Sequence, residues 1–285
     1  KYSGVYEQGP ESLRAQRAQA LLDRGLIPEG TELWAPPTFP KFLPAYVKPW
    51  SMMDDVARKS ASRPMEIYAA MVEYMDDQIH RLIDELERTG HLENTYIVFL
   101  SDNGANGATP LSYPGNTREW FLNEYKQGVE DQGRRGSHTY MGRDWASVSA
   151  SPFKLYKGAI AEGGIRAPLI VTGPLVEKNK ISKQVSHITD LTATLYALAG
   201  INTSSNILFK DKIRPEGQSL FENWKDISNE KSRTFATELF GHRSVVSDRW
   251  KATNMRPPLG SGKWELYDLS EDPSEVNNLA EVYPD

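Results

Sequence analysis

The sequence predicts an α/β fold, in which helices cover a mainly parallel sheet, followed by a small C-terminal α+β domain with an antiparallel sheet. Three observations predict this. A long amphipathic helix pattern leads into an apolar strand at residues 95–100, which is half of an α/β unit. A second apolar strand is expected at residues 167–171. Toward the C-terminus the pattern changes to short strands separated by turns, which is typical of an antiparallel sheet.

Two segments have the periodicity of amphipathic helices. In the first, residues 65–86, apolar side chains recur at three- and four-residue steps and acidic residues occupy the other face. Pro64 stands near its expected start and Gly90 just past its end, as helix punctuation predicts. The second helix is expected at residues 187–198 and stops at Gly200.

The strands fall into two groups. The apolar runs at 95–100 and 167–171 do not alternate, so we expect strands buried on both faces of a parallel sheet. The C-terminal strands are expected at residues 234–239, 243–246, 250–252 and 264–268. We place the domain boundary near residues 205–215. This divides the chain into residues 1–210, in the larger α/β part, and residues 211–285, in the smaller domain.

Composition limits the classes of function. The chain has 285 residues, of which 39% are hydrophobic, so it can bury a sizeable core. Its formal net charge is -5, whereas a general nucleic-acid-binding protein is usually basic, and no nucleic-acid partner is expected. No apolar run is long enough for a membrane span, so no membrane partner is expected. The absence of cysteine excludes disulfides and thiolate metal sites within the chain.

Asp102 and Asn103 directly follow the first apolar strand. In open α/β sheets, ligands bind beyond the carboxyl ends of the strands. Carboxylate and amide oxygens are ligands that Ca²⁺ and Mg²⁺ take, although two residues supply only part of a shell of roughly six to eight oxygens. The alternative is a simple turn, because Asp-Asn-Gly is a common turn tripeptide.

Lys157 is the candidate for contact with an anionic substrate. A single lysine is most often a solvated surface charge. Lys157, however, lies between Tyr156 and Gly158, shortly before a Gly-Gly pair and the second apolar strand. In that setting an ammonium can neutralise charge that develops on a leaving group. His138, in a long loop, and His242, at a strand turn, are weaker candidates for substrate contact, with structural roles as the alternative.

Several segments, taken in order, resemble bacterial arylsulfatases of the type I, formylglycine-dependent sulfatase family. They are residues 71–76, 97–104, 155–157, 163–168 and 264–269 with 272–273. Each segment is a weak motif alone, but their order and spacing match over almost the whole chain. The resemblance implies an alkaline-phosphatase-like fold and hydrolysis of a sulfate ester, either a small molecule or a glycan. It also implies a periplasmic or secreted location.

The resemblance also implies roles for individual residues. Asp102 and Asn103 match the family's second pair of Ca²⁺ ligands, with Mg²⁺ as the alternative cation. Lys157 matches a lysine that contacts the substrate sulfate. Members of the family use a formylglycine hydrate as nucleophile. A divalent cation and a lysine would both draw charge from a transferring sulfuryl group.

The nucleophile motif of the family, Cys-x-Pro-x-Arg or Ser-x-Pro-x-Arg, does not occur in this chain. Residues 62–66 and 112–116 come near it but have Glu66 and Asn116 in place of arginine. The resemblance therefore implies the C-terminal part of a sulfatase. Either the chain is a fragment, with formylglycine in a missing N-terminal portion of the same protein, or it pairs with a separate N-terminal chain; we favour the fragment. The chain begins at Lys1 without methionine or a signal-peptide pattern, and we expect that this is not its native start. We expect the isolated chain to bind Ca²⁺ weakly and not to hydrolyse sulfate esters.

Two other functions stay open. One is a phosphoester hydrolase of the alkaline phosphatase superfamily, which shares the sheet and the metal site. Residues 155–157 and 163–166 favour a sulfatase over this alternative. The other is a non-catalytic binding or assembly module, which the absence of the nucleophile motif supports.

Overall fold

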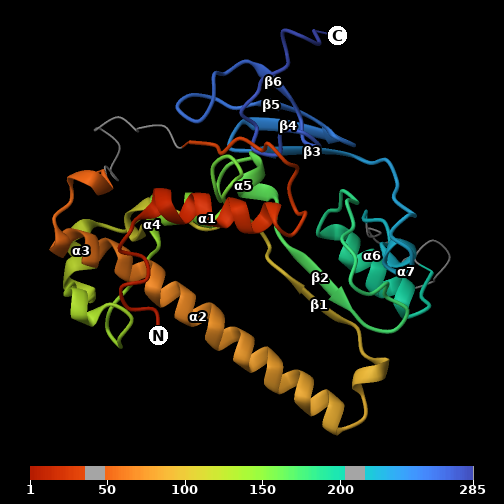
Figure 1. Cartoon of the computed structure of the whole chain (residues 1–285), viewed down its shortest axis with the longest axis horizontal. Helices are drawn as coiled ribbons and strands as arrows, with labels where there is room; N and C mark the ends of the chain where they lie inside the picture. The colour runs from red at the N-terminus through yellow and green to blue at the C-terminus, as the bar shows by residue number, and fades with distance from the viewer. Residues whose placement is uncertain (36–48, 203–215, 285) are drawn as a thin grey trace.

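The computed structural model describes residues 1–35, 49–202 and 216–284 (Figure 1). The predicted domain boundary near residues 205–215 lies outside the described residues. The helices are α1 (Pro10–Leu22), η1 (Trp50–Met52), α2 (Asp55–Arg88), η2 (Leu92–Asn94), η3 (Pro110–Ser112), α3 (Arg118–Glu124), η4 (Val129–Asp131), α4 (Gly142–Ser149), α5 (Glu162–Ile165), α6 (Thr189–Leu198) and α7 (Phe221–Lys225). The strands are β1 (Ile97–Leu100), β2 (Leu169–Thr172), β3 (Thr234–Leu239), β4 (His242–Ser247), β5 (Trp250–Asn254) and β6 (Trp264–Asp268). No described helix is both long and apolar enough to cross a lipid bilayer.

The long helix α2 is confirmed, but the prediction that it begins near Pro64 is wrong. It begins earlier, where the side chain of Asp54 caps it by accepting a hydrogen bond from the first turn. Pro64 therefore lies inside the helix, at a cost of about 3 kcal/mol. Packing on either side offsets this cost, because Met65 is buried against Trp145, and the indole Nε1 of Trp145 donates to the Ala61 carbonyl at 2.6 Å.

The two apolar strands are confirmed as β1 and β2, but their surroundings differ from the prediction. Within the described residues they pair only with each other, antiparallel, from Ile97 opposite Thr172 to Leu100 opposite Leu169. Burial on both faces is not observed, since Ile170 is 61% exposed. The physical reason is that no other described strand continues this two-stranded sheet, so its apolar side chains remain in solvent.

The C-terminal antiparallel sheet is confirmed, with strand order β3-β4-β5-β6 (blue in Figure 1). It packs over the segment that contains α5, as Figure 1 shows. The buried residues of this core are Trp34, Leu155, Ala159, Ile160, Ala161 and Met255. Residues 155–161 therefore pack against the C-terminal part of the chain in one shared apolar core.

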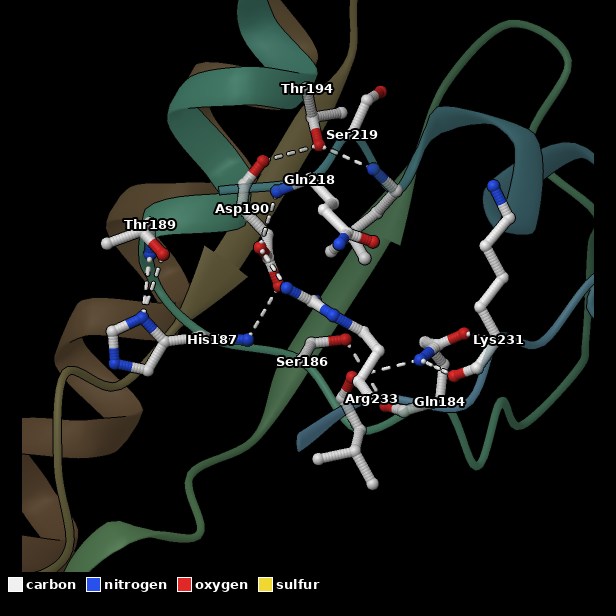
Figure 2. Close-up of polar contacts among 12 residues, drawn as sticks. Gln184, Ser186, His187, Thr189, Asp190, Thr194, Gln218, Ser219, Lys231 and Arg233 are labelled. Carbon is white, nitrogen blue, oxygen red and sulfur yellow. Dashed lines mark hydrogen bonds and ion pairs between the residues drawn. The ribbon is translucent and has the colours of Figure 1, made fainter. Parts of the chain in front are cut away.

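The first turn of α6 is anchored by Asp190 (Figure 2). This fully buried carboxylate accepts hydrogen bonds from the backbone N–H groups of His187 at 2.8 Å and Gln218 at 2.9 Å. Both of its oxygens also pair with the guanidinium of Arg233, just before β3. Burial raises the pKa of Asp190, but the bonds from Arg233 and the two backbone amides outweigh it and hold the pKa below its usual value.

We expect the substitution Asp190→Asn to lower the free energy of unfolding by about 3 kcal/mol at neutral pH, because the Arg233 guanidinium would stay buried without its countercharge. Urea unfolding measures this, with Asp248→Asn as the control, since Asp248 is exposed.

The same substitution should have a defined pH dependence. Because the folded pKa of Asp190 is lowered, its contribution is complete above the unfolded pKa of about 4 and is lost as the pH falls through the folded pKa. The stability difference between the two proteins should therefore shrink at acid pH. Equal stability at pH 7 would show that this interaction does not anchor α6.

Candidate functional site

The turn that follows β1, residues 101–104, is tied to the chain around α5. We call it the candidate metal turn. The N–H of Ser101 donates to the Pro168 carbonyl at 3.3 Å, and the N–H of Gly104 donates to the Gly164 carbonyl at 2.9 Å. The Gly104 amide is therefore directed across to Gly164 and does not close a turn on the Asp102 side chain. Within the described residues, the exposed Asp102 carboxylate has no hydrogen bond or ion pair.

Glycines make this close approach possible. A Cβ added to Gly104 would lie 1.9 Å from the Gly163 carbonyl oxygen, which no real side chain can do. A Cβ on Gly107 would lie 2.6 Å from the ring of Tyr156. The backbone thus needs glycine at position 104, for lack of space and not for an unusual φ, whereas a side chain at position 107 would have to displace the Tyr156 ring.

The same contacts bring Lys157 to the candidate metal turn. Its backbone N–H donates to the Ala105 carbonyl at 3.0 Å, directly after the turn. Its side chain is exposed and has no partner among the described residues. The structure therefore places Asp102, Asn103 and Lys157 on two segments that are hydrogen-bonded to each other, although more than fifty residues separate them in the sequence (157 − 103 = 54).

The two candidate ligands fit part of a divalent-cation site. The Asp102 carboxylate and the Asn103 amide are hard oxygen donors of the kind that Ca²⁺ prefers. No group of three or more metal-ligating acidic or histidine side chains occurs in the described part of the chain. A complete shell of roughly six to eight oxygens needs further ligands from elsewhere.

The structure places His138 in a different environment. Its ring packs against Tyr125 at 5.1 Å and Phe121 at 5.9 Å between centroids. It lines a pocket of about 280 Å³, whose aromatic wall also includes Trp50 and Trp145. Sequence analysis did not find this pocket, because its walls come from distant segments and its aromatic residues follow no motif.

The pocket approaches the Lys157 segment through α4. Arg143 and Asp144 line the pocket and also affect the neighbouring Tyr156. Burial raises the pKa of Tyr156, while the charge of Arg143 lowers it and that of Asp144 raises it. Arg143 and Asp144, in the first turn of α4, are therefore close to Tyr156 as well as to the pocket.

His242 begins β4 and has a structural partner. Its Nδ1 accepts a hydrogen bond from the backbone N–H of Arg256 at 3.0 Å. This bond connects the start of β4 to the residue that follows Met255, a member of the core under the C-terminal sheet. The contacts of His242 therefore do not join it to the candidate metal turn.

Sequence analysis missed a buried charge cluster at the start of α5. The ammonium of Lys251 lies 2.8 Å from Glu162 Oε1 and 3.0 Å from Glu275 Oε1. Glu162 immediately precedes the glycine pair that contacts the candidate metal turn. The available signal was the alternation of β5, which places Lys251 and Thr253 on its buried face.

Two protein-family models match the chain. The model described as Sulfatase matches residues 3–201. The model described as N-sulphoglucosamine sulphohydrolase, C-terminal, matches residues 154–283. Together they span nearly the whole sequence and overlap at the segment that carries Lys157.

Curated relatives are similar over most of the chain. An uncharacterised sulfatase of Schizosaccharomyces pombe is 34% identical, covering 100% of this chain and 51% of that protein. An arylsulfatase of Klebsiella aerogenes is 33% identical, covering 85% of this chain and 49% of that protein. The chain thus spans about half the length of these relatives.

A solved structure from Bacteroides thetaiotaomicron, described with the metabolism of multiple glycosaminoglycans, has a similar fold. Its TM-score is 0.50 at 21% identity, covering 74% of this chain and 40% of that chain. This likeness concerns the fold alone.

We expect Gly104→Ala to lower the free energy of unfolding by about 1–3 kcal/mol, because the new methyl group would displace the backbone around Gly163. Gly128→Ala is the matched control. There an added Cβ would meet only the side chain of Asp131, which can move away. Chemical denaturation of both variants tests the contact, and an equal effect of the two substitutions would contradict it.

Proposed function

Because the chain belongs to the sulfatase family, we propose that it forms the C-terminal half of the catalytic unit of an arylsulfatase-like sulfuric ester hydrolase. The observation that carries this proposal is the hydrogen-bonded contact between the candidate metal turn and the Lys157 segment. It joins two hard oxygen donors to a lysine whose ammonium has no partner in the described part of the chain. A divalent cation and an anionic ester suit these groups.

Asp102 and Asn103 would hold Ca²⁺, or alternatively Mg²⁺, together with ligands from outside this chain. When bound, the cation would neutralise negative charge on the sulfate oxygens. Lys157 would direct its ammonium to the sulfate and stabilise the negative charge that develops on the leaving oxygen. Neither role requires a nucleophile from this chain.

The remaining machinery would come from an N-terminal portion of the same protein, which would carry the formylglycine. The length of the relatives supports this, since the chain covers only about half of each. Exposed apolar side chains support it as well, because a large uncovered apolar surface marks an interaction site. They are Met71, Val72, Met75 and Leu82 on α2, Phe99, Leu169 and Ile170 on the two-stranded sheet, and Ile188 and Leu195 near α6.

This N-terminal portion would pair with the open edges of β1 and β2. The result would be the mainly parallel sheet of an alkaline-phosphatase-like domain, to which residues 1–210 would belong. Residues 211–285 would form the smaller C-terminal domain. We place the complete protein in the periplasm or outside the cell, as the family resemblance implies.

The substrate would be a sulfate ester of a small molecule or a glycan. The pocket beside α4 is lined by aromatic side chains, including His138 and Tyr140, which suit the planar or ring-shaped leaving group of an aryl or sugar sulfate. The names of the relatives agree with this range, since one is an arylsulfatase and another, from Bacteroides thetaiotaomicron, an N-acetylglucosamine-6-O-sulfatase.

We expect Asp102→Asn to weaken Ca²⁺ binding by at least about ten-fold in the protein that includes its N-terminal portion, because a ligand carboxylate loses its charge. Isothermal titration calorimetry measures the affinity. Asp77→Asn, an exposed position on α2, is the matched control. Wild-type affinity in the Asp102 variant would exclude this residue as a ligand.

We expect Lys157→Met to lower kcat for sulfate esters by about 100-fold, with a larger effect on alkyl than on nitrophenyl sulfates, because poor leaving groups need more stabilisation. Lys178→Met, at an exposed position, should leave kcat unchanged. Steady-state assays should also compare matched sulfate and phosphate esters.

Three results would count against the proposal. A preference for the phosphate ester would favour a phosphoester hydrolase. No turnover by the complete protein would favour a binding module. Hydrolysis by the 285-residue chain alone would contradict the external nucleophile.

A further inference from the structure

Lys251 is a buried charge on the inner face of the C-terminal sheet. Its side chain is fully buried on β5, and its ammonium lies between the carboxylates of Glu162 and Glu275. Burial opposes the charge of Lys251, but the two carboxylates outweigh it and raise the pKa of the lysine. The ammonium therefore stays charged, held between two fixed acceptors.

Glu275 connects this lysine to the start of α5. Its other carboxylate oxygen accepts a hydrogen bond from the backbone N–H of Glu162 at 2.7 Å. Its own backbone has φ 55°, a conformation that costs energy for any residue with a Cβ. Lys154 adds a second connection, since its ammonium donates to the Tyr267 hydroxyl at 3.2 Å. Both ends of residues 154–162 are thus held by the C-terminal region.

From α5, the connection continues to the site. The carbonyl of Gly164 accepts the hydrogen bond from Gly104, and the Lys157 amide is bonded just after the same turn. The backbone of the glycine pair is in close contact with residue 155, because a Cβ on Gly163 would lie 2.2 Å from the Leu155 carbonyl oxygen. A displacement of α5 would therefore move Lys157 relative to the candidate metal turn.

We propose that Lys251 is a positioning residue of the site: through Glu162 it fixes α5, and with it Lys157, against the candidate metal turn. Apolar residues of the same volume could hold the sheet on α5 equally well. A charge between two fixed carboxylates also selects one register, since any sliding would separate the ions. The inference rests on the proposed function only for its catalytic readout.

The first experiment is hydrogen–deuterium exchange on the 285-residue chain. In Lys251→Met, two buried carboxylates would face each other, with only the more exposed Arg166 guanidinium, 3.6 Å from Glu162 Oε2, as a countercharge. We therefore expect the amides of Gly104 and Lys157 to exchange about ten-fold faster relative to those of α2. Arg249→Met is the matched control. It removes a cation beside the same strand, but one whose side chain is 57% exposed and pairs with Asp268. Unchanged exchange at the site, or equal acceleration in α2, would overturn the proposal.

Glu162→Gln provides a second variant if Lys251→Met does not fold. Here Lys251 keeps Glu275 as a neutral buried pair, and the bond from the Glu162 N–H to Glu275 remains. The variant loses the negative charge of residue 162, which pairs with Lys251 and with Arg166. We expect faster exchange at Gly104 and Lys157 and unchanged exchange in α2. Wild-type exchange at both amides would overturn the proposal.

The catalytic readout uses the complete protein with its N-terminal portion. Small displacements of a catalytic group can cost about 100-fold in rate, so we expect Lys251→Met to lower kcat for alkyl sulfates by roughly that factor with little change in KM. Arg249→Met should keep both parameters. A rise in KM with unchanged kcat would overturn the positioning role.

The two readouts separate the two proposals. If the complete wild-type protein hydrolyses no sulfate ester, the proposed function fails, while the exchange data still decide whether Lys251 positions the Lys157 segment. If it does hydrolyse them and Lys251→Met leaves both kcat and exchange unchanged, the positioning role alone fails.

Discussion

The arrangement of this chain depends on one buried ion cluster, in which the ammonium of Lys251 is held by Glu162 and Glu275. Removing water from three charges is costly, and mutual attraction offsets this cost only if their geometry is kept. The C-terminal sheet supplies Lys251, and α5 begins with Glu162. The ion cluster therefore fixes the register in which the sheet packs on α5. The apolar core beside the cluster fills the rest of this contact but sets no comparable register.

Backbone contacts connect the ion cluster, through α5, to the candidate metal turn. Gly104 and the glycine pair of α5 approach until no Cβ would fit, so the two segments meet through main-chain atoms. Asp102 and Lys157 stay exposed and Asn103 half-buried. The sulfatase chemistry that we propose needs this combination of rigid backbone and uncommitted side chains. The open strands β1 and β2, with the exposed apolar residues of α2, agree with our proposal that an N-terminal portion completes the catalytic unit.

Local sequence patterns predicted the helices and strands, whereas their burial and packing depend on long-range contacts. The periodicity of α2 and the short C-terminal strands are local properties, and both were found. The position of Pro64 inside α2 was predicted wrongly, because a proline is typical of a helix start, whereas here α2 begins at the Asp54 cap and packing against Trp145, far along the chain, supports the residues beside Pro64. Burial of β1 on both faces was wrongly expected. An apolar run indicates that a strand is stable when it is buried, but it does not show whether other segments of this chain bury it. The candidate site residues followed from family motifs. Lys251 did not, because a lysine in a strand gives no sign of its partners.

The central claim is that Asp102, Asn103 and Lys157 form one site. The most direct test is a crystal structure of the complete protein with Ca²⁺ and inorganic sulfate. The account predicts Ca²⁺ on Asp102 and Asn103, with the Lys157 ammonium within hydrogen-bonding distance of the same sulfate. A cation bound without these two residues, or a Lys157 side chain directed away from the sulfate, would contradict it.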